Sequence, residues 1–253
     1  MINNMMRYLF SFFLMLFFLP LFANAKESLV VDYYTLARYE ETQVKPYVER
    51  WRLSVNDKCS VFAQVEGDKE LFEGSSFQYA IYKEKAGIDM LLYKGNIGDF
   101  LFYYSEPLPQ MDWQMDESDS TICDYPCQKA EVQFRGKKWI VWYTLDIPYS
   151  DGPWKLNGLP GLILKAVDAD KNYSFEAQKI SWSDRKLSKI DCRDAKKTTL
   201  ENYQKDYLWN CKDSHDFMRA VTGKTFKIMI GDKEWKPAPI TPCLMEYVDD
   251  LKK

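Results

Sequence analysis

Short runs of β-branched and aromatic residues recur along the chain, separated by polar or Gly/Pro-rich breaks. Runs of this length and composition, bounded by turn residues, indicate β-strands. Nearly all of them lie between residues 29 and 181, and helical spacing appears only after residue 198. The predicted strands cover 29–39, 49–66, 88–93, 100–104, 113–115, 127–134, 139–147, 161–168 and 173–181.

Two β-hairpins are predicted in the middle of the chain. The first joins 131–134 to 139–145 through a turn that contains Gly136, and the second joins 162–167 to 173–180 through a polar turn. Gly, Asp and Asn suit short reversals of this kind. Along 139–145, successive side chains alternate between two faces, and both faces carry large apolar groups. This pattern predicts a strand covered on both sides, or a curved sheet whose concave face holds something.

Helices are predicted only in the last quarter of the chain. Thr198 and Glu201 form a capping-box pattern, and apolar residues follow at helical spacing as far as Cys211. A second helix is expected to begin with Ser214 as its cap and to end at Gly223, before a strand at 225–230. The acidic stretch 112–120 is interpreted as an exposed hairpin loop. Together these elements predict a mainly β protein with a single antiparallel curved sheet or half-open β-barrel, and one or two helices in the C-terminal half.

The N-terminus has the three-part pattern of a secretory signal peptide. Residues 1–7 carry one positive charge, 8–22 are almost entirely apolar, and Ala23-Asn24-Ala25 is a small-x-small cleavage site. Residues 1–25 are therefore predicted to be removed, leaving 26–253 as one β-rich domain. An uncleaved membrane anchor is the alternative, but the apolar run is short for a span of about 20 residues. No later segment is apolar enough to span a bilayer, so an exported protein without a transmembrane segment is expected.

The chain has six cysteines, and all of them follow the predicted cleavage site. An even number in an exported chain favours disulfides, with fifteen possible connectivities for six cysteines. Two pairings are plausible from position, Cys123 with Cys127 and Cys192 with Cys211. A zinc site has little support, because His215 is the only histidine.

Charge and residue types narrow the possible chemistry. The formal net charge is −3, and no long basic run is present, so nucleic acid is not an expected partner. His215 lies among charged residues in a predicted helix and is interpreted as a solvated side chain. Residues 168–174 resemble the first half of a calcium loop but lack its Gly and its final Glu, so a polar turn is the better interpretation. No metal or other cofactor is predicted.

Aromatic side chains gather in sequence around a Gly/Pro-rich loop at 152–161. Aromatic residues at a cleft stack on sugars or line apolar pockets, although in a β-rich domain they also pack the core. The candidate ligand or partner contacts are Trp139, Trp142, Tyr149 and Trp154. Asp146 and Asp151 flank the same region, and a carboxylate pair is one way to hydrolyse a glycoside. The sequence signal for such a pair is weak.

The motifs around this loop resemble those of the GLPGLI family, exported proteins of Bacteroides-type bacteria. The resemblance is strongest from about 113 to 180, and 241–246 resembles a diverged form of the family's usual ending. It implies export and a β-rich fold, and it carries over no catalytic residues because no activity is established for the family. The motifs are 127–130, 134–136, Trp139, 142–144, 147–148, 152–155 and the hexapeptide Gly158, Leu159, Pro160, Gly161, Leu162 and Ile163.

Three functions remain open from the sequence. The favoured one is a non-enzymatic protein of the cell envelope, in the periplasm, at the outer-membrane surface or outside the cell. It would bind a lipid-like or other apolar ligand, a peptide, or an outer-membrane or other envelope protein. The alternatives are a hydrolase of envelope glycans or peptides that uses Asp146 and Asp151, and a structural surface protein without a ligand. The hexapeptide is interpreted as architectural. Trp154, just before it, is the expected contact if this region touches a partner, and Trp154→Ala is expected to leave the fold intact.

Overall fold

The computed structural model describes residues 27–38, 44–66, 69–70, 79–87, 89–225, 227–242 and 244–246. The predicted signal peptide and Cys243 lie outside these ranges. The strands are β1 Ser28–Ala37, β2 Tyr47–Val55, β3 Cys59–Glu66, β4 Lys69–Glu70, β5 Tyr79–Glu84, β6 Met90–Ile97, β7 Phe100–Pro107, β8 Gln114–Ile122, β9 Tyr125–Phe134, β10 Lys137–Thr144, β11 Leu162–Asp168, β12 Tyr173–Ser183, β13 Lys196–Lys197, β14 Ile228–Ile230 and β15 Lys233–Trp235. The helices are α2 Leu200–Lys212 and α3 Ser214–Thr222.

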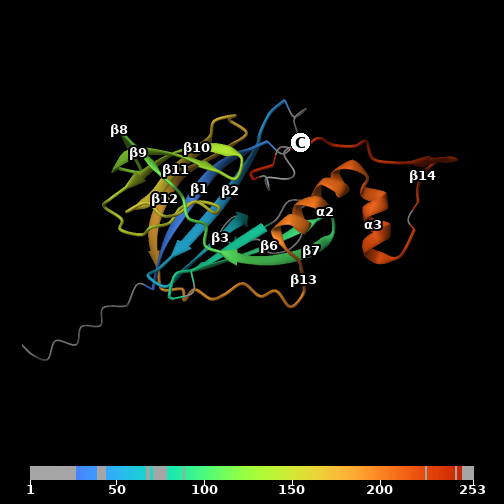
Figure 1. Cartoon of the computed structure of the whole chain (residues 1–253), viewed down its shortest axis with the longest axis horizontal. Helices are drawn as coiled ribbons and strands as arrows, with labels where there is room; N and C mark the ends of the chain where they lie inside the picture. Colours follow the sequence, from blue (N-terminus) through green and yellow to red (C-terminus); the bar gives the residue numbers. More distant parts are fainter. Residues whose placement is uncertain are drawn as a thin grey trace, which may run out of the picture.

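One large sheet forms the body of the protein. Its strand order is β13-β7-β6-β5-β3-β2-β1-β12-β11-β10-β9-β8, with β4 paired to β3, so β13 and β8 form open edges and the sheet does not close into a barrel. Two antiparallel meanders make up its halves, and the N-terminal strand β1 joins them by pairing with β2 and β12. Figure 1 shows the resulting curved sheet, with α2 lying against β6 and β7. The predicted mainly β fold with C-terminal-half helices is confirmed.

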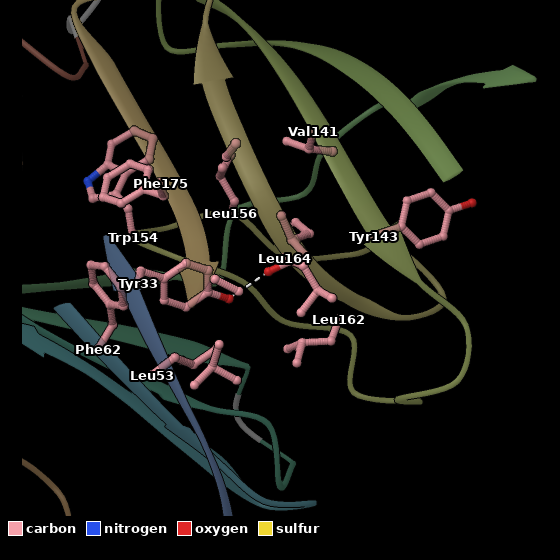
Figure 2. Packing of buried hydrophobic residues seen from close by; sticks show 14 of the residues in the cluster. Tyr33, Leu53, Phe62, Val141, Tyr143, Trp154, Leu156, Leu162, Leu164 and Phe175 are labelled. Carbon is pink, nitrogen blue, oxygen red and sulfur yellow. Dashed lines mark hydrogen bonds between the residues drawn. The ribbon is translucent and has the colours of Figure 1, made fainter. Parts of the chain in front are cut away.

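The main core lies where the two meanders face each other. Tyr33, Trp51 and Phe62 from one part of the sheet meet Trp139 and Phe175 from the other, all almost completely buried. Figure 2 shows Trp154 beside Phe175 and Tyr33 in this core, and the dashed line runs from the Tyr33 hydroxyl. That hydroxyl donates to the carbonyl oxygen of Ile163 at 2.6 Å. Period-2 alternation buries the inner side chains and leaves the outer ones partly exposed.

Both predicted hairpins are present. Between β9 and β10 the turn is tighter than predicted, since Phe134 pairs directly with Lys137. Its two central residues, Arg135 and Gly136, have φ of +48° and +83°. A two-residue turn with two positive φ angles matches the right-handed twist of the flanking strands, and glycine adopts such angles without steric cost.

Three predictions about strands were wrong. The run 49–66 is two strands, because the Asn56 side chain accepts hydrogen bonds from the backbone N–H groups of Lys58 and Cys59 and reverses the chain there. The acidic stretch 112–120 is not a loop, since most of it belongs to edge strand β8. Strand β5 was missed entirely. In these places tertiary pairing overrides a weak local pattern.

The two predicted helices are present, with caps shifted by one residue. The N-cap of α2 is Thr199, whose side chain accepts from the N–H of Asn202, and that of α3 is Asp213. The predicted stop at Gly223 is correct, since this residue is the C-cap of α3 with φ +69°. Among the described residues, no helix is both long and apolar enough to cross a bilayer.

The expected disulfides are not formed among the described cysteines. Cys59, Cys123, Cys127 and Cys192 are free thiols, so neither the Cys123–Cys127 nor the Cys192–Cys211 bond is present. The Cys123 thiol instead donates to the carbonyl oxygen of Ala177 at 3.1 Å. Cys192 packs beside the cluster that contains Cys59, whereas Cys211 is buried on helix α2. Position in the sequence therefore did not predict which thiols would bond.

Candidate functional site

The Gly/Pro-rich loop connects β10 to β11 and is folded into the core. All residues from 151 to 157 are buried, together with Leu159. The loop is fastened at its base by Leu162 N–H to Ile147 O at 3.0 Å and Ile163 N–H to Asp151 O at 2.9 Å. Trp113 Nε1 donates to the carbonyl oxygen of Asn157 at 2.8 Å and holds its tip. What the curved sheet holds on its inner side is therefore a segment of its own chain.

Gly161 ends this loop at a very close backbone approach. A Cβ atom at position 161 would lie 2.0 Å from the carbonyl oxygen of Thr144. No side chain fits there, because the nearest atoms belong to the backbone of Thr144 and Leu145 and cannot move aside in a densely packed interior. Leu162 and Ile163 follow directly and are completely buried. The hexapeptide 158–163 thus lies where the loop turns back into β11.

Two of the four aromatic contact candidates lie in the core. Trp139 is 0% exposed and Trp154 1% exposed, and their ring centroids are 5.3 Å apart. Trp154 is therefore not the expected surface contact, because the loop turns inward at this residue, whose φ is +53°. Its ring then packs against Phe134, with 5.7 Å between centroids. Neither Trp139 nor Trp154 is placed to touch a partner.

Trp142 and Tyr149 remain partly exposed. Trp142 belongs to a row of side chains on the outer face of the sheet, where the ammonium of Lys165 lies 5.5 Å from its ring centroid. Lys165 in turn forms an ion pair of 2.8 Å with Glu176. Glu176 pairs in register with Tyr34, which is 43% exposed. The row thus places an ion pair between two aromatic side chains, across four neighbouring strands.

A second row on the same face is mostly apolar. Its members pair in register from strand to strand, with the polar Ser174 between Val167 and Leu36, so their side chains lie in one row. Val48, at its end, is 59% exposed, and the others are partly exposed. The two rows together are named the outer patch, which consists of Tyr34, Leu36, Val48, Ile140, Trp142, Lys165, Val167 and Glu176.

A buried ion pair fixes the start of the loop. Lys83 Nζ lies 2.6 Å from Asp151 Oδ1 and also donates to two loop carbonyls, Gly152 O at 3.0 Å and Leu156 O at 3.1 Å. Lys85 Nζ lies 2.7 Å from the other carboxylate oxygen. Burial alone would raise the pKa of Asp151, but Lys83 and Lys85 outweigh it and hold the pKa at about 2. Asp151 is therefore ionised, enclosed and fully paired.

This geometry does not support the carboxylate pair expected from the sequence. Asp146 is exposed on the turn after β10, whereas Asp151 is 0% exposed and faces Lys83 and Lys85. A glycosidase needs both carboxyl groups on one accessible bond. Asp146 and Asp151 are not arranged for that chemistry.

A second buried charge cluster joins the loop to the C-terminal tail. Lys155 Nζ is bound by Glu106 Oε1 at 2.8 Å, Glu246 Oε1 at 2.5 Å and the Tyr104 hydroxyl at 3.1 Å. Arg135 pairs with Glu106 at 2.5 Å and lies 3.5 Å from Glu246. Burial alone would lower the pKa of Arg135, but Glu246 and Glu106 raise it. Because each carboxylate is held by cations, the cluster ties the tail to the loop.

Sequence reasoning missed these charged residues. Lys83 stands on β5 on the same face as Tyr79 and Ile81. Recognising this strand would therefore have predicted an inward-pointing lysine. Lys155 stands in the 152–155 motif, but nothing in that motif indicates a buried ion pair. No sequence signal indicates that Glu246 and Glu106 meet it, since these residues are far apart in the chain.

Other sequence candidates are occupied by internal contacts. Asp168 accepts from Lys137 Nζ at 2.9 Å and from the N–H of Tyr173 at 2.7 Å, which closes the polar turn that resembled a calcium loop. No group of His, Cys, Asp and Glu suited to a metal ion occurs within the described ranges. His215 lies partly buried on α3, and the ring nitrogens make no hydrogen bond to any described residue. It is thus less solvated than expected.

Two surface hollows border the sheet. One, of about 690 Å³, lies between Lys94 and the segment 185–194. The ammonium of Lys94 is neutralised there by Asp194 at 2.6 Å. The other, of about 470 Å³, lies beside edge strand β8. It is lined by Asp119, Ser120, Thr121, Pro126, Cys127, Gln128, Leu145 and Asp146.

These features define a mainly β protein built on an open curved sheet, with a loop folded into its concave side. Residues 131–165 match the model of a family described as a protein of unknown function (Porph_ging). The match covers the β9–β10 hairpin, the buried loop and the start of β11. Among curated proteins, no sequence matches this chain.

The fold also resembles a solved protein, PNGF-II. Its structures in the P21 and C2 space groups align with TM-scores of 0.52 and 0.51, each at 16% identity over 72% of this chain. This chain covers 33% and 32% of those chains, about a third of their length. At this identity the likeness concerns the fold alone.

Proposed function

We propose that this chain is an exported, non-enzymatic protein of the cell envelope that binds another envelope protein. The observation that carries the proposal is the outer patch. Tyr34 and Val48 are 43% and 59% exposed and lie on neighbouring strands with Leu36, while Trp142 stands at the other end of the same row as Tyr34, beyond Glu176 and Lys165. Contiguous apolar groups on a surface are typical of interaction sites.

The patch suits a protein better than a lipid. The ion pair of Lys165 and Glu176 lies between its two aromatic residues, Trp142 and Tyr34. An acyl chain would remove these charges from water without offering them a hydrogen bond, which is costly. A protein surface offers both apolar and polar groups, and aromatic residues are enriched in such interfaces.

The inner side of the sheet supports a non-enzymatic role. The charged residues inside, Asp151, Lys155 and Glu246, bind one another or neighbouring charges and hold the chain together. They are enclosed by the loop and the tail that they fasten. The signal-peptide pattern of residues 1–25 supports export.

The test uses the double variant Tyr34→Ser/Val48→Ser. The partner is first cross-linked to the wild-type protein in the envelope of its own host, identified by mass spectrometry and purified. Burying a side chain such as Val contributes about 1.5–3 kcal/mol, so the double variant should bind this partner at least about tenfold more weakly. The mature protein should begin at Lys26 and fractionate with the envelope.

The matched control is Met229→Ser/Ile240→Ser, which removes two other exposed apolar side chains, 52% and 36% exposed. It should bind the partner as the wild type does. Unchanged affinity of the Tyr34/Val48 variant, or an equal loss in the control, contradicts the role of the outer patch. Retention of residues 1–25 on a cytoplasmic protein contradicts export.

A further inference from the structure

Strand β8 is an open edge of the main sheet. It pairs with β9 on one side and ends the strand order on the other. Its nine residues, Gln114–Ile122, are mostly exposed. An edge strand presents backbone N–H and C=O groups to solvent, and an extended segment of another chain can pair with them.

This edge is strongly acidic. Asp116 is paired with Lys129 at 2.8 Å, whereas Glu117 and Asp119 are exposed and form no ion pair with any described cation. Two copies of β8 side by side would place carboxylates opposite one another, which is destabilising. The charge therefore disfavours a second copy of this chain and favours a basic segment.

A hollow of about 470 Å³ lies beside β8. Asp119 and Asp146 line it from two different elements, and within the described part of the chain neither forms an ion pair. Leu145, 51% exposed, and Pro126 provide apolar lining between them. The hollow at the 185–194 segment differs, because Asp194 already neutralises Lys94 there.

The chemistry of the hollow's lining suits a lysine or arginine side chain. Such a side chain has an apolar stem, which would contact Leu145 and Pro126, and a cationic head, which would reach the carboxylates. Charge-assisted hydrogen bonds to carboxylates are stronger than neutral ones. Acidic residues on β8 alone could serve only to prevent edge pairing. The hollow adds Asp146 and Leu145 from the turn after β10, which edge protection does not require.

We infer that β8 and the adjoining hollow bind an extended basic segment of another protein by strand addition. The segment pairs its backbone with residues 119–122 of β8, beyond the register shift that follows Asp116, and places a Lys or Arg between Asp119 and Asp146. This site is separate from the outer patch. The inference does not depend on the partner proposed for that patch.

The probe is a nine-residue peptide of alternating Lys and Val, with acetylated and amidated ends and a fluorescent label. Its binding to the purified mature protein is followed by fluorescence anisotropy at low and moderate salt. We expect saturable binding that weakens with salt, and protection of β8 amides from hydrogen exchange. Asp119→Asn/Asp146→Asn should weaken binding at least about tenfold, the effect of losing a charge-assisted hydrogen bond.

Two controls separate strand addition from general attraction to acidic surfaces. Glu201→Gln/Asp216→Asn removes the same number of charges from exposed helical ion pairs and should leave binding unchanged. A peptide methylated on alternate backbone nitrogens keeps its charge but cannot form the strand hydrogen bonds. It should bind at least about tenfold more weakly.

Several outcomes would overturn the inference. They are equal binding by the methylated peptide, an equal loss in the helical control, no binding at low salt, or protection outside β8. Dimerisation of the chain through β8 would also overturn it. Tyr34→Ser/Val48→Ser should bind the probe normally, so failure of this site and failure of the outer patch are distinguishable.

Discussion

At the scale of single residues, the interior is organised by a few large or charged side chains. Trp154 fills the space between the two halves of the sheet, in contact with Trp139 and Phe134. Asp151 and Lys83 fasten the backbone that carries it. Because the interior is packed densely, these contacts cannot relax easily when one member is removed.

Trp154→Ala should unfold the protein or destabilise it strongly. Removing a buried tryptophan leaves a cavity and costs about 3–5 kcal/mol. Chemical denaturation measures the loss directly. Trp182→Ala is the control, because Trp182 is 49% exposed and its removal should cost less than about 1 kcal/mol. A stable Trp154 variant would show that the loop does not support the core.

The free energy of unfolding should depend on pH through the ionisation of Asp151. Its pKa is about 2 in the folded protein, below its ordinary value of 3.8. A depressed carboxyl pKa contributes stability above the unfolded value, and this contribution is lost as the pH falls through the folded value. Between pH 4 and pH 2 the wild type should therefore lose stability on the order of 2 kcal/mol from this group.

Denaturation at pH 6, 4 and 2 compares the wild type with Asp151→Asn. The variant should be less stable at pH 6, because Lys83 loses its buried partner, and its stability should fall less between pH 4 and 2. Lys85→Met is a milder variant that keeps Lys83 paired. By raising the pKa of Asp151, it should shift the acid loss to higher pH. Parallel pH profiles for all three proteins would refute this role.

At the scale of elements, the loop between β10 and β11 fills the inner side of the curved sheet. It occupies the concave side and is held at its base by backbone hydrogen bonds from Leu162 and Ile163. The tail reaches the same place through Glu246. Loop, tail and sheet therefore stabilise one another and should unfold together.

Gly161→Ala tests the close approach at the end of this loop. The added Cβ would lie 2.0 Å from Thr144 O, and backbone atoms cannot yield as a flexible side chain can. We expect a loss of about 3 kcal/mol or more. Gly98→Ala is the comparison, since its Cβ would lie 3.6 Å from the nearest atom at φ +57°. It should cost only about 1–2 kcal/mol for that φ, and equal losses would contradict the steric argument.

At the scale of the whole molecule, the two sides of the sheet have different roles. The inner side binds the protein's own loop and tail through Asp151, Lys155 and Glu246. The outer patch and the β8 edge are the surfaces on which the two proposals rest. Tyr34→Ser/Val48→Ser and Asp119→Asn/Asp146→Asn test them separately, because the variants lie on different strands and alter different chemistry.

Local patterns in the sequence indicate much of the fold. The β9–β10 and β11–β12 hairpins, the alternation of Trp139, Val141 and Tyr143, and the Gly223 helix stop follow from turn chemistry and side-chain period, which act over a few residues. Strands without a strong local pattern, β5 and most of β8, were not predicted. Acidic β8 is a strand because β9 supplies its backbone partners.

The sequence by itself determined the fold class, the two central hairpins, the helices and the signal-peptide pattern. Only the tertiary structure decided that Trp154 points inward, that Cys123 and Cys127 do not bond to each other and that Lys155 meets Glu106 and Glu246. The physical reason is distance along the chain. Turn and periodicity signals are local, whereas burial, ion pairing and the open edge at β8 depend on which distant segments the folded sheet brings together.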